Sequence, residues 1–260
     1  MKKHVHLLLA LLFLPLLTIA QNKVAASEII AKINRGEAVN YKNAEITGNL
    51  DMTKLQNMKL KNEKAGKNDT KEHISTVIAP LVFENCTFKG DVLAYFNPDN
   101  GVKSASTTGG EVYNTDFKKE VRFENCTFEA ATAFKYSDFE QEVSFAGSRF
   151  AEEALFKYSK FAKAADFSKA TFADDANFKY TAFRDEANFK GAVFEDDADF
   201  KYAKFETGAD LQRSVFEGLA NFKYTHFSKT ANLDNVSFKG GTDFKYTRLN
   251  NRPASLIPVK

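Results

Sequence analysis

Lysine and tyrosine side chains recur at a fixed interval through the second half of the chain. The tripeptide Phe-Lys-Tyr occurs six times, and each copy begins 22 residues after the one before. If this interval is one structural repeat, the two residue types form adjacent ladders on one flat, outward side, with a rung every ~4.8 Å and a length of about 25 Å. The ladders consist of Lys135, Tyr136, Lys157, Tyr158, Lys179, Tyr180, Lys201, Tyr202, Lys223, Tyr224, Lys245 and Tyr246.

Two interpretations of this strip remain open. Stacked tyrosines stabilise neighbouring coils, as cross-strand aromatic pairs do, by roughly 0.2–1 kcal/mol each. Alternatively, aromatic rings interleaved with cations suit a repetitive, extended, anionic ligand such as an acidic glycan. We favour the structural interpretation, and the strip is also the best candidate binding surface in the sequence.

Pairs of carboxylates recur with the same interval, just before the lysines. They are Glu152/Glu153, Asp174/Asp175 and Asp196/Asp197. Stacked on one corner, they offset the repulsion among the lysines, which is about 1 kcal/mol per close pair in water. A calcium site is the rival interpretation, since Ca²⁺ takes six to eight oxygen ligands. The adjacent lysines argue against it, and we predict no metal site.

No residue constellation indicates catalysis. Beyond residue 20 the chain has only two histidines, His73 and His226, far apart in sequence. We recognise no Cys/His metal spacing, no glycine-rich phosphate loop and no supported Ser/His/Asp arrangement. We therefore predict a protein that is not an enzyme and has no cofactor.

The elements that carry these residues follow from the spacing of the large apolar residues. From Phe123 to Leu249, Phe or Leu recurs at alternating intervals of five and six residues, usually two positions after a small residue. This fits neither the helical period of 3.6 nor the strand period of 2. Four sides of five, six, five and six residues complete a 22-residue coil, with the phenylalanines inside. Burying each phenylalanine contributes roughly 1.5–3 kcal/mol, so we predict that they form the core rather than a binding groove.

Short segments with a small residue, Asp or Asn and then a large apolar residue support this prediction. They include Ala-Asn-Phe-Lys-Tyr at 176–180, Ala-Asp-Phe-Lys-Tyr at 198–202 and Ala-Asp-Leu-Gln-Arg at 209–213. The chain resembles the pentapeptide-repeat family over at least residues 112–249, in a phenylalanine-rich form with an extra residue in every second repeat. The resemblance implies an all-β fold, a right-handed quadrilateral β-helix with the small and large residues facing inward. The extra residue should widen every second corner.

Cys86 and Cys126 occupy the same inward position of two copies of Phe-Glu-Asn-Cys-Thr-Phe, at 83–88 and 123–128. If an insertion interrupts one side of a coil between them, they lie directly above one another. Their separation then suits a disulfide, which an oxidising compartment would favour. Two stacked free thiols that fill interior space are the alternative, and both remain open.

The rest of the chain divides around the coils. We predict a signal peptide at 1–20, an N-terminal cap helix within 21–40 that starts at Ser27, the β-helix at 41–249 and a tail at 250–260. The first coil is expected to begin near Ala44. Polar loop insertions are predicted near 53–73 and 96–110. Leu256, Ile257 and Val259 in the tail either cover the last coil or leave it for a second molecule, which allows a homodimer through the C-terminal end.

The N-terminus indicates export. Lys2 and Lys3 precede an apolar run at 7–20, with small residues at the end of the run. This pattern is typical of a secretory signal peptide, and the run is too short for a bilayer span, which needs about 20 residues. We therefore expect a periplasmic or extracellular location. Without residues 1–20 the chain has 34 basic and 34 acidic residues, a balance that argues against a nucleic-acid partner. We also expect no membrane span in the mature chain.

These observations lead to a functional hypothesis with two rivals. We predict an exported, non-enzymatic scaffold or binding module with an unidentified protein or glycan partner. Some members of the family protect a DNA topoisomerase by imitating DNA, but export and zero net charge both oppose that role here. The other rival is a purely structural solenoid that self-associates.

Overall fold

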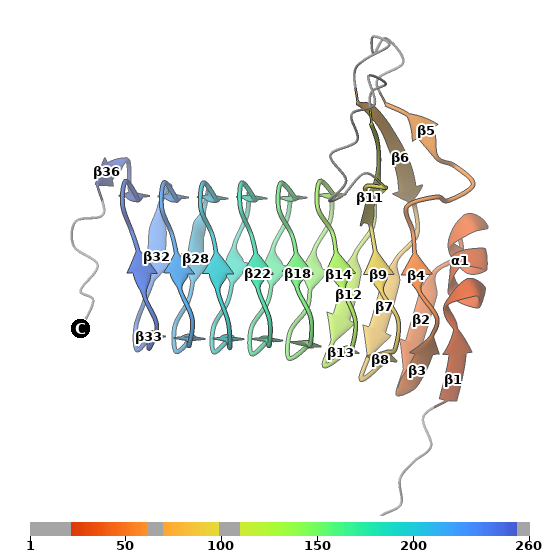
Figure 1. The fold of residues 1–260 in the computed structure, drawn as a ribbon, viewed down its shortest axis with the longest axis horizontal. Helices are drawn as coiled ribbons and strands as arrows, with labels where there is room; N and C mark the ends of the chain where they lie inside the picture. Colours follow the sequence, from red (N-terminus) through yellow and green to blue (C-terminus); the bar gives the residue numbers. More distant parts are fainter. Residues whose placement is uncertain (1–21, 62–69, 99–109, 254–260) are drawn as a thin grey trace, which may run out of the picture.

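The structure is a computed structural model that describes residues 22–61, 70–98 and 110–253. The expected signal peptide at 1–20 and the apolar residues of the tail lie outside the described residues. Within the described residues, the chain winds into stacked rectangular coils (Figure 1), and each complete coil adds one strand to each of four parallel sheets. The predicted quadrilateral β-helix is therefore confirmed.

The four sheets are named A to D here, in the chain order of their first strands. Sheet A contains β1 (Asn22–Ala25), β3 (Ala44–Thr47), β8 (Thr87–Phe88), β13 (Thr127–Phe128), β17 (Arg149–Phe150), β21 (Thr171–Phe172), β25 (Val193–Phe194), β29 (Val215–Phe216) and β33 (Ser237–Phe238). Sheet B contains β2 (Val39–Lys42), β7 (Leu81–Glu84), β12 (Val121–Glu124), β16 (Val143–Ser144), β20 (Ala165–Asp166), β24 (Ala187–Asn188), β28 (Gly208–Asp210) and β32 (Thr230–Asn232).

The other two sheets complete each coil. Sheet C contains β4 (Leu50–Asp51), β9 (Val92–Leu93), β14 (Thr132–Ala133), β18 (Ala154–Leu155), β22 (Ala176–Asn177), β26 (Ala198–Asp199), β30 (Ala220–Asn221) and β34 (Thr242–Asp243). Sheet D contains β5 (Lys59–Leu60), β6 (Lys71–Val77), β11 (Glu111–Phe117), β15 (Asp138–Phe139), β19 (Lys160–Phe161), β23 (Ala182–Phe183), β27 (Lys204–Phe205), β31 (His226–Phe227), β35 (Arg248–Leu249) and β36 (Arg252–Pro253), with β10 (Tyr95–Phe96) paired to β11.

The phenylalanines form the core, as the sequence predicts. Phe156, Phe167 and Phe178 are fully buried. Phe156 stacks on Phe178 of the next coil with ring centroids 5.0 Å apart and planes 2° from parallel, whereas Phe167 meets Phe156 edge to face at 84°. Both geometries are favourable for aromatic pairs. Aromatic columns therefore fill the interior, which has no room for a groove.

The alternating intervals correspond to two kinds of corner. The five-residue steps turn through a hydrogen-bonded β-turn, such as the one in which Ser159 N donates to Phe156 O at 3.1 Å. The third residue of these turns has a positive φ, +64° for Tyr158. The six-residue steps, as between Phe150 and Phe156, accommodate their extra residue in a broader bend.

The N-terminal end of the coils is covered by a strand and a helix. β1 pairs with β3, and α1 (Ala26–Asn34) follows at once, with Ile29 and Ile33 buried against the first coil. The prediction that Ser27 caps the helix is wrong. Ala25 holds the N-cap position without a side-chain hydrogen bond, because the chain enters the helix directly from a paired strand. The first coil also starts earlier than expected, at Val39 in β2.

The single helix among the described residues, α1, has nine residues and is too short to cross a membrane. At the other end, β36 folds back antiparallel on β35. Phe238, Phe244 and Leu249 of the last coil are only partly buried against the core.

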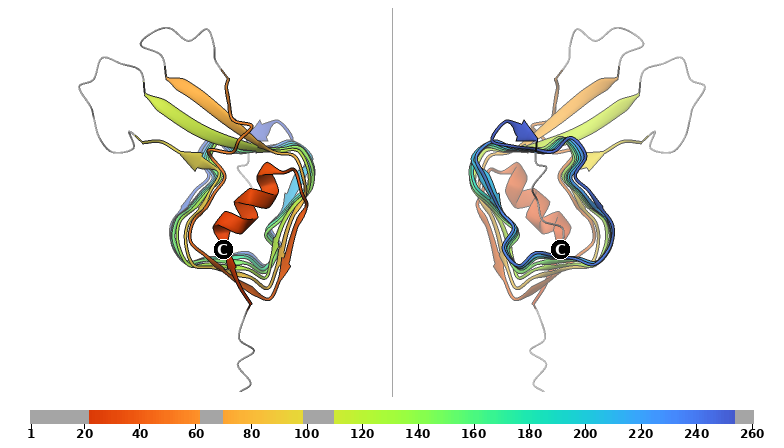
Figure 2. Two further views of the ribbon diagram at one scale, coloured as in Figure 1. Left: turned by 90° about the vertical axis from the view of Figure 1, so that its right-hand side faces the viewer. Right: turned by 90° about the vertical axis from the view of Figure 1, so that its left-hand side faces the viewer.

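The first predicted insertion contains strand residues on both sides of 62–69, and residues 62–69 and 99–109, the latter most of the second insertion, lie outside the described residues. β6 and β11 pair in parallel over seven residues, from Lys71↔Glu111 to Val77↔Phe117, and β5 and β10 add antiparallel strands on either side. These strands extend sheet D away from the coils as a small side sheet (Figure 2). The sequence suggested loops because the polar, lysine-rich composition of 53–73 hides a pairing between segments 40 residues apart.

Candidate functional site

The Lys/Tyr strip lies along the corner where sheet C turns into sheet D. Each Lys-Tyr pair occupies the two central positions of a β-turn, and the tyrosine has φ between +59° and +64° in all six copies. The prediction of a flat side is therefore wrong, because the chain turns from sheet C into sheet D at this dipeptide. We call this edge of the molecule the Lys/Tyr corner.

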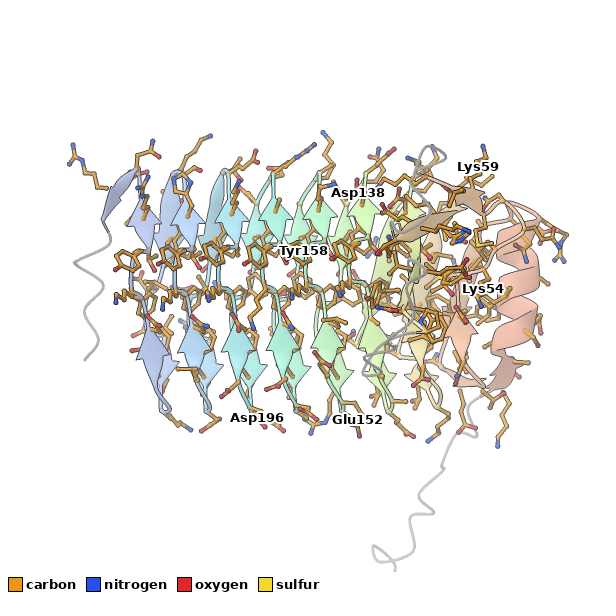
Figure 3. The ribbon with its side chains drawn as sticks, turned by 45° about the horizontal axis from the view of Figure 1, so that its top comes forward. Lys54, Lys59, Asp138, Glu152, Tyr158 and Asp196 are labelled. Atoms are coloured by element: carbon orange, nitrogen blue, oxygen red, sulfur yellow. The ribbon has the colours of Figure 1, made fainter. Side chains whose placement is uncertain are left out.

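The tyrosine rings stack into a continuous row (Figure 3), in which successive centroids are 4.7–4.9 Å apart. Tyr158 and Tyr202 lie inside this row, and each has a stacked neighbour on both faces. Only the ring edges and hydroxyl groups of such residues can meet a ligand. At the C-terminal end of the row, Tyr246 is 57% exposed.

Polar side chains support the backbone of this corner. Asp199 Oδ1 accepts a hydrogen bond from Lys201 N at 3.0 Å, an Asx arrangement that Asn221 repeats in the next coil. This accounts for the Asp or Asn before the phenylalanine in the last four of the six copies. Inside the corner, Thr181 Oγ1 donates to Phe156 O of the preceding coil at 3.0 Å. The small inward residue thus satisfies a carbonyl as well as saving space.

The lysines give the corner a local positive charge. In five of the six copies the ammonium lies 5.0–5.8 Å from the centroid of the following tyrosine ring, whereas Lys179 contacts Asp199 at 2.7 Å. Burial, and then the charges of Lys135 and Lys179, lowers the pKa of Lys157. An anion placed here would relieve that repulsion.

The diagonally opposite corner, between sheets B and A, provides an internal comparison. It makes the same turn with the same positive φ, but the residue there is Gly147, Lys169, Gly191, Arg213 or Asn235 in successive coils. The turn itself accepts several residue types. The backbone of this turn therefore does not require tyrosine, and its recurrence on the Lys/Tyr corner is due to its side chain.

The acidic pairs occupy the corner between sheets A and C, as expected; Glu152 and Asp196 lie along the lower edge in Figure 3. Carboxylate oxygens of Asp174, Asp175 and Asp196 lie within 4.8 Å of one another, with Asp175 and Asp196 exposed. Burial, followed by the charges of Asp196 and Asp197, raises the pKa of Asp175. Three carboxylates supply at most six oxygens, the lower end of the six to eight that Ca²⁺ takes.

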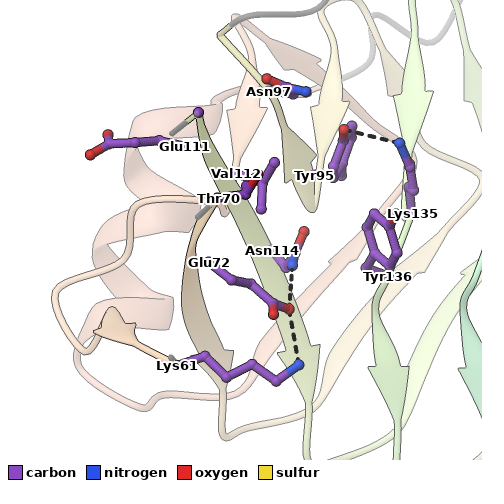
Figure 4. A pocket seen from close by; sticks show the side chains of 11 residues that line it. Lys61, Thr70, Glu72, Tyr95, Asn97, Glu111, Val112, Asn114, Lys135 and Tyr136 are labelled. Carbon is purple, nitrogen blue, oxygen red and sulfur yellow. Dashed lines mark hydrogen bonds and ion pairs between the residues drawn. The ribbon is translucent and has the colours of Figure 1, made fainter. Parts of the chain in front are cut away.

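A cavity of about 660 Å³ opens at the N-terminal end of the Lys/Tyr corner, against the side sheet. Figure 4 shows that its wall combines Tyr136 and Lys135 of the corner with Tyr95 of β10 and with Glu72 and Asn114 of β6 and β11. Lys135 Nζ donates to the Tyr95 hydroxyl at 3.0 Å.

A second hollow, of about 450 Å³, lies beside the C-terminal end of the same corner. The rings of Tyr202, Tyr224 and Tyr246 form one wall, and His226 and Arg248 of sheet D are also part of its lining. His226 Nε2 is 3.0 Å from Asn251 Oδ1. The predicted tyrosine row therefore has a hollow at each end.

The cysteines lie one above the other, as predicted, because Thr87↔Thr127 and Phe88↔Phe128 pair in register. Both thiols are free and buried. The interaction between the two thiols lowers the pKa of Cys86, and the same interaction together with burial raises the pKa of Cys126. Cys126 Sγ also lies 3.4 Å from Glu124 O.

Sequence reasoning missed the cavity residues Glu72, Tyr95 and Asn114, as well as Arg248. Repetition was its only guide, and these residues lie where the repeat is interrupted or at its last coil. Tyr95 did offer a usable signal. Ala94 N and Phe134 N donate equivalent hydrogen bonds to the next coil, to Ala133 O and Leu155 O. The residues that follow them, Tyr95 and Lys135, therefore hold the same turn position in successive coils.

Comparison with known proteins agrees with this architecture. A family model described as pentapeptide repeats (9 copies) matches residues 113–160, 156–204 and 200–248. We found no curated protein and no solved structure with significant similarity. The three matched segments together span 113–248, which is more than half of the 260 residues. The chain belongs to the pentapeptide-repeat family.

Proposed function

We propose that this protein is an exported, non-enzymatic scaffold whose Lys/Tyr corner binds an extended anionic ligand, an acidic glycan. Export rests on the pattern of residues 1–20. The binding role rests on the corner, which presents cations and phenol hydroxyls at the coil spacing.

The contrast between the two turn corners carries the proposal. A non-glycine residue in the left-handed conformation costs roughly 1–2 kcal/mol. The B–A corner reduces this cost with Gly147, Gly191 and Asn235, but the Lys/Tyr corner keeps tyrosine in all six copies. Ring stacking offsets part of the cost, since an aromatic pair contributes about 0.5–1.5 kcal/mol. Stacking alone does not require a lysine beside every tyrosine.

The geometry restricts how a ligand can bind. Stacked neighbours cover the ring faces of Tyr158, Tyr180 and Tyr202, so a sugar cannot lie flat on them. A chain that runs along the corner instead meets hydroxyl groups and ammonium groups. An acidic polysaccharide supplies a carboxylate for the ammonium groups and hydroxyl groups for the tyrosines.

Isothermal titration calorimetry with polygalacturonate tests the proposal, with neutral dextran as the reference polymer. The doubly substituted Lys179→Gln/Lys201→Gln protein should bind polygalacturonate roughly 2- to 30-fold more weakly, because each exposed ion pair contributes about 0.2–1 kcal/mol. The affinity should also fall as salt is added.

The B–A corner offers a matched control. Lys169→Gln/Arg213→Gln removes the same charge from the same kind of turn on the opposite edge of the coil. This variant should bind as the original protein does. Equal losses of affinity in both double variants would mean that the overall charge of the protein, and not the Lys/Tyr corner, accounts for binding. If the original protein does not bind polygalacturonate, the proposal is overturned.

A second candidate, self-association through the C-terminal end, is favoured by the last coil. β32, β33 and β34 are the terminal strands of sheets B, A and C, while Phe238 and Phe244 remain partly buried. A second copy of this chain, placed end to end, would pair these strand edges and cover the rings. Light scattering over a range of protein concentrations tests this candidate: Phe238→Glu should yield a monomer, and a monomeric original protein would rule it out.

A further inference from the structure

The cavity at the N-terminal end of the Lys/Tyr corner is built by parts of the chain that are distant in sequence. Glu72 and Asn114 come from β6 and β11, which extend beyond the coils, and Tyr95 comes from β10. Because Tyr95 pairs with Asn114 in the antiparallel register, both side chains lie on the same face of the side sheet. This face is turned toward Tyr136, the first ring of the tyrosine row (Figure 4).

Asn114 has a hydrogen-bonding group that nothing in the described residues satisfies. The residue is 99% buried, and its Nδ2 donates to Glu72 Oε1 at 2.9 Å. That bond fixes the orientation of the amide, so its Oδ1 faces the cavity between Val112 and Tyr95 (Figure 4), where it has no partner. A buried acceptor without a donor destabilises the protein, and such groups are rare in native structures.

Glu72 is held in place from two sides. Lys61 Nζ donates to the same Oε1 atom at 2.9 Å. Burial lowers the pKa of Lys61, but the hydrogen bond to Glu72 and its negative charge outweigh burial and leave that pKa raised. The Lys61 ammonium is therefore charged at neutral pH, and its bond to Glu72 Oε1 holds that side chain beside Asn114.

The lining beside Asn114 also supplies donors. Lys135 uses one of its three protons for the Tyr95 oxygen, which leaves the phenol proton of Tyr95 available to another acceptor. Burial, followed by the charges of Tyr158, Tyr95 and Glu72, raises the pKa of Tyr136, so this hydroxyl also keeps its proton. The cavity lining thus combines acceptors at Asn114 and Glu72 with donors at Lys135 and Tyr95.

We infer that this cavity is a subsite for one acidic sugar unit, a uronic acid, at the end of the glycan proposed above. A sugar hydroxyl donates to Asn114 Oδ1, and the carboxylate accepts from Lys135 and Tyr95. The volume of about 660 Å³ is within the ~300–1,000 Å³ range of small-molecule sites. The rings of Tyr95 and Tyr136 are inclined at 53° to each other, so they are not stacked as the rings inside the tyrosine row are. The inference rests on the proposed function and places the end of the glycan in this cavity.

Titration of the full chain with trigalacturonate tests the inference. This short probe reaches the cavity but spans little of the corner. Asn114→Leu keeps the branching of the side chain but removes both the Oδ1 acceptor and the Nδ2 donor to Glu72, and it should weaken trigalacturonate binding about tenfold, the loss of one buried hydrogen bond to the ligand. Tyr95→Phe keeps the ring and should weaken it about threefold or more. Tyr41→Phe, in β2 of sheet B and outside both the cavity lining and the Lys/Tyr corner, is the matched control and should leave binding unchanged.

The outcomes separate the cavity from the corner. Loss of trigalacturonate binding in folded Asn114→Leu or in Tyr95→Phe supports the subsite, even if the Lys179/Lys201 variant binds polygalacturonate normally and the corner proposal fails. Polygalacturonate binding that depends on Lys179 and Lys201, with trigalacturonate unbound or equally bound by both cavity variants, overturns the subsite and leaves the corner proposal standing. Tyr95→Phe keeps the test decisive if Asn114→Leu does not fold.

Discussion

Tyr158 and Tyr180 stack with ring centroids 4.7 Å apart and planes 9° from parallel, while both backbones have φ near +60°. The left-handed conformation is unfavourable for tyrosine, and the stacked geometry is favourable. The corner therefore balances local backbone strain against contacts between coils. That balance can be measured by changing one contribution at a time.

The first prediction compares two turns of the same kind. Lys169→Asn should stabilise the protein by about 0.5–1 kcal/mol, because asparagine tolerates the left-handed conformation and Lys169 has no ring stacking to lose. Tyr180→Asn gains the same relief but loses two stacked contacts, and should destabilise the protein by up to about 2 kcal/mol. Chemical denaturation measures both. A stabilised Tyr180→Asn would show that the row contributes nothing to stability.

The second prediction concerns close packing between coils at Gly218. A Cβ atom at Gly218 would lie 2.6 Å from Asp196 C and 2.9 Å from Asp197 N, both backbone atoms that cannot move aside. Gly218→Ala should therefore destabilise the protein by about 2 kcal/mol or more. Gly191→Ala is the control: its nearest neighbour is a side-chain atom at 3.8 Å, and only the positive φ of +68° opposes it. Thermal unfolding should show a clearly larger loss for Gly218→Ala.

The third prediction concerns pH and the acidic corner. Burial and the neighbouring Asp196 and Asp197 raise the pKa of Asp175 in the folded state. A raised carboxyl pKa means that the ionised form is disfavoured by folding, so its protonation stabilises the protein as the pH falls through the folded-state value. Asp175→Asn should therefore be more stable than the original protein at neutral pH, by less than about 1 kcal/mol for this largely exposed group.

This advantage should vanish below the ordinary aspartate pKa of about 3.8, where the original side chain is protonated as well. Unfolding curves of both proteins between pH 3 and pH 7 provide the measurement. Asp185→Asn, on another corner, is the reference substitution. An advantage that grows on acidification would contradict the assigned cause.

The fourth prediction concerns the stacked cysteines. Because both thiols are buried, the purified protein should contain two free thiols that react with a thiol reagent only after unfolding. Mass spectrometry of the intact, alkylated protein counts them. A mass that lacks two hydrogens, with no reaction after unfolding, would show that the disulfide forms instead. Cys86→Ala/Cys126→Ala should fold and show no thiol reaction in either state.

Much of the architecture was predictable from residues close in sequence. The interval between Phe134 and Phe156 fixes the length of a coil, and the phenylalanines have only one place to be buried once the chain closes on itself. The same repetition predicts that Tyr158 follows Tyr136 in one row and that Cys86 lies beside Cys126. Each of these relationships is a contact between adjacent coils, and one local rule, repeated, determines them all.

The tertiary structure alone decided the rest. Spacing cannot distinguish a flat side from a corner, because that depends on the φ of the tyrosine. Nor can it place Asn114 beside Glu72 and Tyr95, since no repeat relates these residues. They meet because β6 and β11 continue their pairing outside the coil and because β10 folds back on β11. Periodicity in the sequence determined the scaffold, whereas the cavity depends on pairing between non-repeating segments, and such pairing is settled only when the whole chain packs.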